Sequence, residues 1–504
     1  MAYHWRVLSV ITMGTLLTGV NVSTLNVALP VVVRHFHAGA FASGWVLLSF
    51  MLVNTVLLMV CGRLSDVFGR RETYITGYAI FTVSCLALGF APSIEVLIVL
   101  RCVQAAGFAM ILANGTAIIS HVFPKHLLSQ GLGFYISTIS VAQILGPSVG
   151  GFLADAAGWR WVFWFNVPLG AAAIAWGGAT LKKVPRGPRE PVDVLGSVLL
   201  FGWLGGLLLA LSEAGALGWR SPLVVAGLVA FAVLIPVFWW AQRRAAYPLL
   251  NLSLFADAGF TLANVAAFVH TFARFGIVLV YALFFQGVWG ADAAVAGLAV
   301  LPVPIAMMVA SPLAGALSRR TSPRAVAVGG PVLTAIGLLI LMAALGADTP
   351  YAVVATGLAL MGAGSGIFLT ANTTAIMARI PSVQLGAVNG MRLTLQNIGN
   401  TLGIAVALSL IASTLARPDR PLVYAGTVPH TGGGPVGQGG GNSSALPDLL
   451  GGFHRAIAVM LVMAVLTVVA AVASMVGGER TSRTKGQAWE GQQATSTSLA
   501  PNER

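Results

Sequence analysis

Apolar runs of about 20 residues recur from one end of this chain to the other, and that is the length a helix needs to cross a bilayer. Fourteen runs can be read from the sequence, near 8–33, 43–62, 73–91, 95–122, 131–154, 160–181, 194–213, 221–241, 258–286, 293–317, 324–346, 350–378, 386–416 and 453–476. Only 9% of the residues are charged, whereas ordinary globular chains carry about 25%. The sequence therefore predicts an all-α polytopic membrane protein with fourteen transmembrane helices.

The net charge of +13 reflects basic residues placed at the ends of the apolar runs. Basic pairs occur at 70–71, 182–183, 243–244 and 319–320, and most of the 28 Lys and Arg fall on the side that holds the N-terminus. Basic residues accumulate on the cytoplasmic side of membrane proteins. We therefore expect a multi-pass protein of the cell membrane with both termini cytoplasmic, and no binding to nucleic acid.

An internal repeat predicts two related halves. "GRLSDVFGRR" (62–71) follows the second run and "GALSRRTSPR" (315–324) follows the tenth, with Gly62 aligned to Gly315 and Arg71 to Arg324. Repeats of this kind build the halves of many transporters. We predict an N-terminal six-helix half (1–181), two inserted transmembrane helices (182–250), a C-terminal six-helix half (251–476) with a Gly-rich outer loop (417–452), and a disordered cytoplasmic tail (477–504).

Several function classes are disfavoured by what the sequence lacks. No Gly-Lys pair occurs, so a Walker A phosphate loop is excluded and no nucleotide partner is expected. We find no metal-ligand cluster and no set of nucleophile, base and orienting residue, so we expect neither an enzyme nor a cofactor or metal. A non-transporting sensor would need a sizeable soluble domain, and the longest stretch outside the runs is the loop 417–452.

Four stretches resemble motifs of a known family. "GRLSDVFGRR" matches the loop signature G-x-L-[AS]-D-x-x-G-R-[RK], and "LRCVQAAGFA" (100–109) resembles a fourth-span motif, with Ala105 where a glycine is usual. "GFYISTISVAQILGPSVGG" (133–151) resembles a fifth-span antiporter motif, with Ala142 in place of a glycine, and "WRWVFWFNVPLG" (159–170) adds agreement. These motifs occur in the family's order, and the match extends over nearly the whole chain. The sequence therefore resembles the major facilitator superfamily and, within it, the fourteen-span drug:proton antiporters. The resemblance implies the major facilitator fold, with two extra central helices.

The loop signature falls on Gly62, Asp66, Gly69, Arg70 and Arg71, for which the resemblance implies a gating role. An ion pair between Asp66 and a neighbouring helix end would latch the cytoplasmic gate. The alternative is a solvated turn charge, since exposed ion pairs contribute only about 0–1 kcal/mol.

The antiporter motif falls on Gly146, Pro147, Gly150 and Gly151. In the family this bend is thought to seal against proton leak. A proline removes a hydrogen-bond donor and kinks its helix. An ordinary packing kink requires the same residues, so that alternative stays open.

The first span departs from the family pattern. Family members carry an aspartate five residues before the asparagine of "NVALP" (26–30), and this chain has Asn21 there. The family aspartate is associated with proton coupling and cation recognition, whereas an amide cannot titrate. We expect Asn21, Thr24 and Gln104 to line the substrate cavity, with neutral or anionic cargo favoured over cations.

Ionisable groups inside the runs are costly and usually functional. Arg101 matches the family's fourth-span arginine, which is implicated in proton coupling. His270 and Arg274 are four residues apart and share a helix face, and an imidazole titrates near neutral pH. We hypothesise proton coupling through Arg101, His270 and Arg274, with a structural hydrogen-bonding role for His270 as the alternative. Glu213, which ends the seventh run, is expected in an outer loop.

A polar stripe runs along the thirteenth run, where Arg392, Gln396 and Asn400 are spaced i, i+4, i+8. We interpret the stripe as a wall of the substrate cavity. The alternative is packing between helices, which small and polar residues also promote.

These patterns predict a secondary active transporter that exports small, largely hydrophobic compounds, such as drugs and antibiotics, across the cell membrane in exchange for protons. Its partners would be the small-molecule substrate, protons and the lipid bilayer, and we expect it to act as a monomer. A proton-independent facilitator or importer of a small solute is the alternative. The scarcity of carboxylates inside the runs favours that alternative, and the antiporter motif opposes it.

Overall fold

The computed structural model describes residues 2–183, 193–249, 252–346, 348–414 and 445–498, and within those ranges the regular structure is helical. The helices are α1 (Tyr3–Phe36), α2 (Ala40–Phe68), α3 (Arg70–Leu88), α4 (Ile94–Val122), α5 (Leu128–Ala156), α6 (Trp161–Trp164), α7 (Asn166–Thr180), α8 (Val194–Leu217), α9 (Pro222–Arg244), α10 (Ala258–Gly287), α11 (Ala293–Ala299), α12 (Pro302–Arg320), α13 (Pro323–Ala343), α14 (Tyr351–Met377), α15 (Leu385–Thr414) and α17 (Ala445–Ser498). Short 3-10 turns occupy Leu252–Ala256 and Ser382–Gln384. In a bilayer each backbone group must be satisfied within the protein, and helices achieve this within one segment.

Every predicted run corresponds to a helix or a pair of helices. Over the described residues, 13 helical segments are long and apolar enough to cross a membrane. The remaining run, 73–91, corresponds to α3, whose first turn holds Arg70, Arg71 and Glu72 and is therefore less apolar. The run 160–181 is divided into α6 and α7, and the run 293–317 into α11 and α12. The fold class predicted from the sequence is confirmed.

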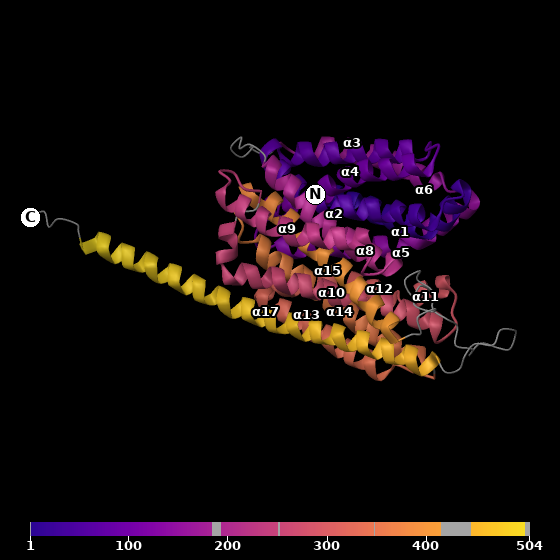
Figure 1. Cartoon of the computed structure of the whole chain (residues 1–504). Helices are drawn as coiled ribbons and strands as arrows, with labels where there is room; N and C mark the ends of the chain where they lie inside the picture. Colours follow the sequence, from indigo (N-terminus) through magenta and orange to yellow (C-terminus); the bar gives the residue numbers. More distant parts are fainter. Residues whose placement is uncertain (1, 184–192, 250–251, 347, 415–444, 499–504) are drawn as a thin grey trace, which may run out of the picture.

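The two halves of the sequence form two groups of helices. In the first half α1 packs on α5, and α4 packs on both α2 and α3. In the second half α14 packs on α12 and α13, while α10 packs on α15 and α17. Figure 1 shows the indigo and purple helices gathered on one side of the bundle and the orange and yellow helices on the other. The most extensive contacts between the groups are those of α2 with α15 and of α5 with α12, and α4 with α15 and α5 with α14 add smaller ones.

Glycines allow these joining helices to approach closely. A Cβ atom added to Gly62 of α2 would overlap the carbonyl of Gly386 on α15, and one added to Gly315 of α12 would lie 2.5 Å from the carbonyl of Ser129 on α5. Gly62 and Gly315 are the aligned residues of the internal repeat. Each copy of the repeat therefore places its glycine at the junction with the opposite half.

Helices α8 and α9 pack mainly on each other, and α8 also contacts α2 and α15. The pair α8–α9 thus lies beside the α2–α15 junction, where α8 contacts one helix from each half.

Helix α17 differs from the sequence expectation at its end. The composition of 477–504 predicts a disordered tail, whereas α17 continues to Ser498 and extends past the bundle in Figure 1. Starting a helix is costly, but extending an existing one adds a hydrogen bond for each residue fixed. The membrane span supplies that start, which composition alone does not reveal.

Candidate functional site

The loop signature lies where α2, α3 and α15 meet. Gly69 joins α2 to α3 with φ of 105°, a backbone conformation that a residue with a Cβ rarely adopts. This turn directs Arg70 back toward Asp66, and Arg70 Nη2 lies 3.1 Å from Asp66 Oδ1. The side chains are 7% and 3% exposed, respectively. The pair is therefore buried and is not a solvated turn charge.

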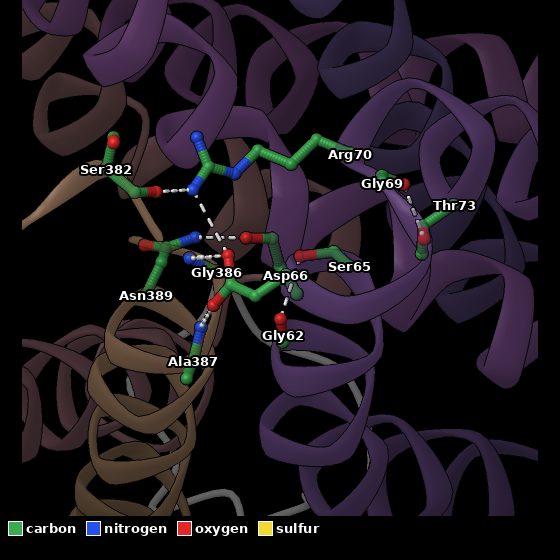
Figure 2. Close-up of polar contacts among 11 residues, drawn as sticks. Gly62, Ser65, Asp66, Gly69, Arg70, Thr73, Ser382, Gly386, Ala387 and Asn389 are labelled. Carbon is green, nitrogen blue, oxygen red and sulfur yellow. Dashed lines mark hydrogen bonds and ion pairs between the residues drawn. The ribbon is translucent and has the colours of Figure 1, made fainter. Parts of the chain in front are cut away.

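Asp66 also binds the start of α15. The N–H of Gly386 donates to Oδ1 at 3.1 Å, and the N–H of Ala387 donates to Oδ2 at 2.8 Å (Figure 2). Arg70 Nη2 in turn donates to the carbonyl of Ser382, just before α15. The first N–H groups of a helix have no partner within it and attract anions. We call these five residues the latch: Asp66, Arg70, Ser382, Gly386 and Ala387.

The latch closes the end of the bundle at which α1 begins. We call this the terminal end. Arg71 extends the contact surface there by donating to the carbonyl of Gly178 on α7 at 2.9 Å. The second copy of the signature has Arg319 where the first has Asp66, and Arg319 Nη1 lies 3.4 Å from Gln130 Oε1 of α5 at an exposed position. The carboxylate of the latch therefore comes from the first copy of the signature, and the second copy has a basic residue in its place.

Asn21, Gln104 and Arg101 form one buried network. Gln104 Nε2 donates to Asn21 Oδ1 at 3.2 Å, and its Oε1 accepts from Arg101 Nη1. Arg101 Nε donates to the carbonyl of Val46 at 3.3 Å, and the guanidinium lies 4.0 Å from the ring centroid of Phe50. The three polar side chains are at most 1% exposed. Asn21 thus reaches the arginine only through Gln104.

Thr24 and the antiporter motif form a helix packing surface. The hydroxyl of Thr24 donates to the carbonyl of Asn21 at 2.9 Å, within its own helix. A Cβ added to Gly150 would lie 2.6 Å from Thr24 Cα, and one added to Gly146 would overlap Ser23. Pro147 lies inside α5, and Gly151 is partly exposed beside it. These contacts fit the packing alternative for the motif.

In the second half, Arg392 is buried on α15, 4% exposed. Its Nη1 donates to Thr373 Oγ1 at 3.1 Å and its Nη2 donates to Asn389 Oδ1 at 2.9 Å. Asn389 Nδ2 then donates to the carbonyl of Ala113 on α4 at 2.7 Å. Arg392 therefore orients an amide that links the two halves. The sequence reasoning missed Asn389, although it lies three residues before Arg392 on the same helix face.

Gln396 and Asn400 continue the stripe. Gln396 Nε2 and Asn400 Oδ1 are buried, and neither has a hydrogen-bond partner in the part of the chain that is described. Buried polar atoms are normally paired, and an exception calls for an explanation. Such atoms are suited to binding a cargo molecule or water.

His270 and Arg274 lie on α10 beside α14. His270 Nε2 lies 3.1 Å from Ser365 Oγ, and its ring centroid lies 4.6 Å from that of Phe368. The Arg274 guanidinium lies 4.1 Å from the ring centroid of Phe275. His270 Nδ1 and Arg274 Nε have no partner among the residues described. The hydrogen bond to Ser365 fits the structural alternative for His270, while the free Nδ1 leaves a position for a proton.

The comparisons with known proteins agree with this architecture. Residues 11–197 and 263–418 match the family model described as Major Facilitator Superfamily. The chain belongs to the major facilitator superfamily. The multidrug resistance protein Stp of Mycobacterium tuberculosis is 33% identical over 413 residues, which cover 81% of this chain and 76% of Stp. The tetracenomycin C resistance and export protein of Streptomyces glaucescens is 28% identical over 420 residues, covering 82% and 78%.

Among solved structures, the proton:xylose symporter XylE superposes with a TM-score of 0.64 at 15% identity, covering 93% of this chain and 95% of that one. At that identity the likeness shows the fold alone. Within this major facilitator protein, the predicted residues thus fall into five places: the latch, the Asn21 network, the packing surface of Thr24 with the antiporter motif, the Arg392 stripe, and the His270–Arg274 pair.

One acid lies elsewhere than expected. Glu213 is within α8 and is 6% exposed, whereas the sequence suggested an outer loop. The apolar run continues as helix to Leu217, one turn past Glu213, because helix propagation does not stop at one polar residue.

Proposed function

We propose that this protein is a secondary transporter that exports small, largely hydrophobic compounds across the cell membrane in exchange for protons. The substrate class is supported by relatives named for multidrug resistance and antibiotic export. The fifth-span motif supports antiport. The observation that carries the proposal is the latch, because it joins the two halves by bonds that can be made and broken as a unit.

Transporters with this architecture work by rocking one half against the other around a central site. For the terminal end to open, the N-terminus of α15 must leave Asp66, and the N–H donors of Gly386 and Ala387 must be satisfied by water. A hydrogen bond to a charged group contributes about 1.5–3 kcal/mol. The latch therefore keeps the terminal end closed until the binding of cargo or a proton offsets the free energy of these hydrogen bonds, a few kcal/mol.

Orientation in the membrane follows from the charge pattern. The basic residues favour the terminal end as the cytoplasmic end. Cargo would then enter from the cytoplasm when the latch opens, and meet the stripe of Arg392, Gln396 and Asn400 along α15. The unpaired amide atoms of Gln396 and Asn400 support that stripe as the cargo wall.

Proton coupling would involve Arg101 through its network, or His270 with Arg274. Burying an arginine at a helix centre costs about 2.5–3.5 kcal/mol on insertion scales, so these positions favour function. The Asn21 network contains no carboxylate in the described residues, and this favours a second candidate, a proton-independent facilitator or importer of a small solute.

The two candidates differ in their response to an imposed gradient. The purified chain would be reconstituted into proteoliposomes with one neutral and one cationic fluorescent substrate, with and without a pH gradient. Antiport predicts uphill dye movement that a protonophore abolishes, and an accompanying proton flux. Equal equilibration rates in both conditions would overturn antiport and support the facilitator. Arg101→Ala and His270→Gln then indicate which network carries the proton.

A further inference from the structure

A cavity of about 200 Å³ lies between α2, α8 and α15, and its lining on α15 begins at Thr401, directly after Asn400 of the polar stripe. Thr55 is its lining residue nearest the terminal end on α2, and Leu408 is the farthest along α15. Because α2 and α15 run antiparallel, Trp45 on α2 and Leu408 on α15 both lie toward the end opposite the latch. The cavity therefore occupies the opposite half of the α2–α15 junction.

Glu213 lines this cavity and is the one charged residue among its described lining residues. Glu213 is 6% exposed, and no hydrogen bond or ion pair joins it to another residue within the described part of the chain. Glu213 lies two residues beyond the apolar span Val194–Leu211, toward the end of α8 opposite the latch. An isolated buried carboxylate is costly unless a partner compensates its charge.

The remaining lining is mostly apolar, with side chains such as Met51, Leu208 and Ile404. Trp45 adds an aromatic ring, and aromatic rings attract organic cations. A dry apolar cavity of about 150 Å³ is large enough to bind benzene. A cavity of 200 Å³ therefore suits one aromatic ring with a small charged head.

We propose that this cavity is a binding site for small lipophilic monocations, aromatic ammonium compounds in particular, with Glu213 as the counter-ion. The ring of such a ligand lies against the apolar side chains of α2 and α15, and its ammonium group lies at the Glu213 carboxylate. The inserted helix α8 thereby supplies a charge that the Asn21 network lacks. Ile404 and Leu408 extend the spacing of the Arg392 stripe along α15, so the site lies beyond the end of that stripe. The proposal concerns binding alone and does not require proton-coupled export.

The cavity also lies where the two halves meet. Its walls come from α2 of the first half and α15 of the second, and the latch joins the same two helices at the other end. Any rocking of the halves changes the spacing of these walls. A cation bound at Glu213 therefore favours one arrangement of the halves over the other.

Equilibrium binding of radiolabelled benzyltrimethylammonium to the purified full chain in non-ionic detergent tests the proposal. This probe has one aromatic ring and a quaternary ammonium group whose charge does not change with pH. A change in its binding therefore comes from the protein and not from the probe. We expect saturable binding at one site, weakened at least about tenfold in Glu213→Gln. Glu95→Gln, which removes an exposed acid on α4, is the matched control and should bind as the unmodified chain does. Neopentylbenzene, the neutral isostere, should not compete.

A second variant locates the site. Ala405→Trp fills the cavity from α15 without changing charge, and it should abolish binding while Glu213 remains. Thermal unfolding confirms that each variant is folded, and if Glu213→Gln does not fold, Ala405→Trp and the neutral competitor decide. Unchanged binding in Glu213→Gln or in Ala405→Trp would overturn the proposal, as would equal weakening in Glu95→Gln or competition by neopentylbenzene. The binding assay in detergent has no pH gradient and does not measure transport. Its result is therefore independent of the proteoliposome assay, which tests proton-coupled export.

Discussion

Replacing Asp66 by Asn should open the terminal end of the bundle. Asp66 accepts hydrogen bonds from the N–H of Gly386, the N–H of Ala387 and Arg70 Nη2, at 3.1, 2.8 and 3.1 Å. An asparagine keeps one acceptor oxygen, but its amino group is a donor. At least one N–H of α15 or the guanidinium of Arg70 would then face another donor in a buried place.

The size of the effect follows from these bonds. Losing one hydrogen bond to a charged group costs about 1.5–3 kcal/mol, and a backbone N–H bond to the neutral amide oxygen is about half as strong as one to the carboxylate. Asp66 is 3% exposed, so solvent screening is small. We expect the closed arrangement to lose about 3 kcal/mol, which corresponds to roughly a 100-fold shift in population.

Cys61 is a native reporter of this opening. It lies on α2 one turn before the latch, is 4% exposed, and belongs to a cluster with Ala113 of α4 and Leu393 of α15. In a background with Cys85→Ser and Cys102→Ala, a hydrophilic maleimide should label Cys61 slowly. Adding Asp66→Asn should raise the labelling rate by at least about tenfold, because labelling follows the open population.

Glu72→Gln is the control, since Glu72 is the neighbouring acid of α3 outside the latch. It should leave the labelling rate unchanged. The reasoning is refuted if Cys61 is labelled at the same rate with and without Asp66→Asn, and the two proteins unfold at the same temperature. Export by the Asp66→Asn variant, measured in the proteoliposomes described under Proposed function, is expected to fall to background. A transporter whose terminal end does not close cannot complete the transport cycle.

Arg101→Ala removes the donor to Gln104 and Val46, so we expect export to fall to background, and normal efflux at an equal expression level would contradict this role. Asn21→Ala leaves Gln104 without its amide acceptor, and it should change the ratio of neutral to cationic dye export while keeping transport; an unchanged ratio would argue against a cargo-path position. Gly390→Val places a side chain against the carbonyl of Leu58, and such overpacking costs about 1–3 kcal/mol. We expect that variant to unfold at a lower temperature and to label Cys61 faster, and identical unfolding and labelling would disprove the close approach.

Local pattern was enough to determine the helices. A run of about 20 apolar residues must be helical in a bilayer because no other open structure satisfies its backbone, so the apolar runs located the membrane-spanning helices. They did not reveal the division into α6 and α7 or into α11 and α12, nor the end of α17. The repeat of Gly62 at Gly315 likewise indicated two halves, since a residue without a side chain is needed wherever helices approach closely.

Tertiary packing decided which polar groups meet. Nothing local to Asp66 indicates that its partners are Gly386 and Ala387, more than 300 residues away, because helix N–H groups become available only where the packing of the halves brings a helix start. The same holds for Glu213, whose position near the end of an apolar run predicts a loop. Glu213 is 6% exposed and lines a cavity together with residues of α2 and α15, and this arrangement of distant segments is not encoded in any single stretch of sequence.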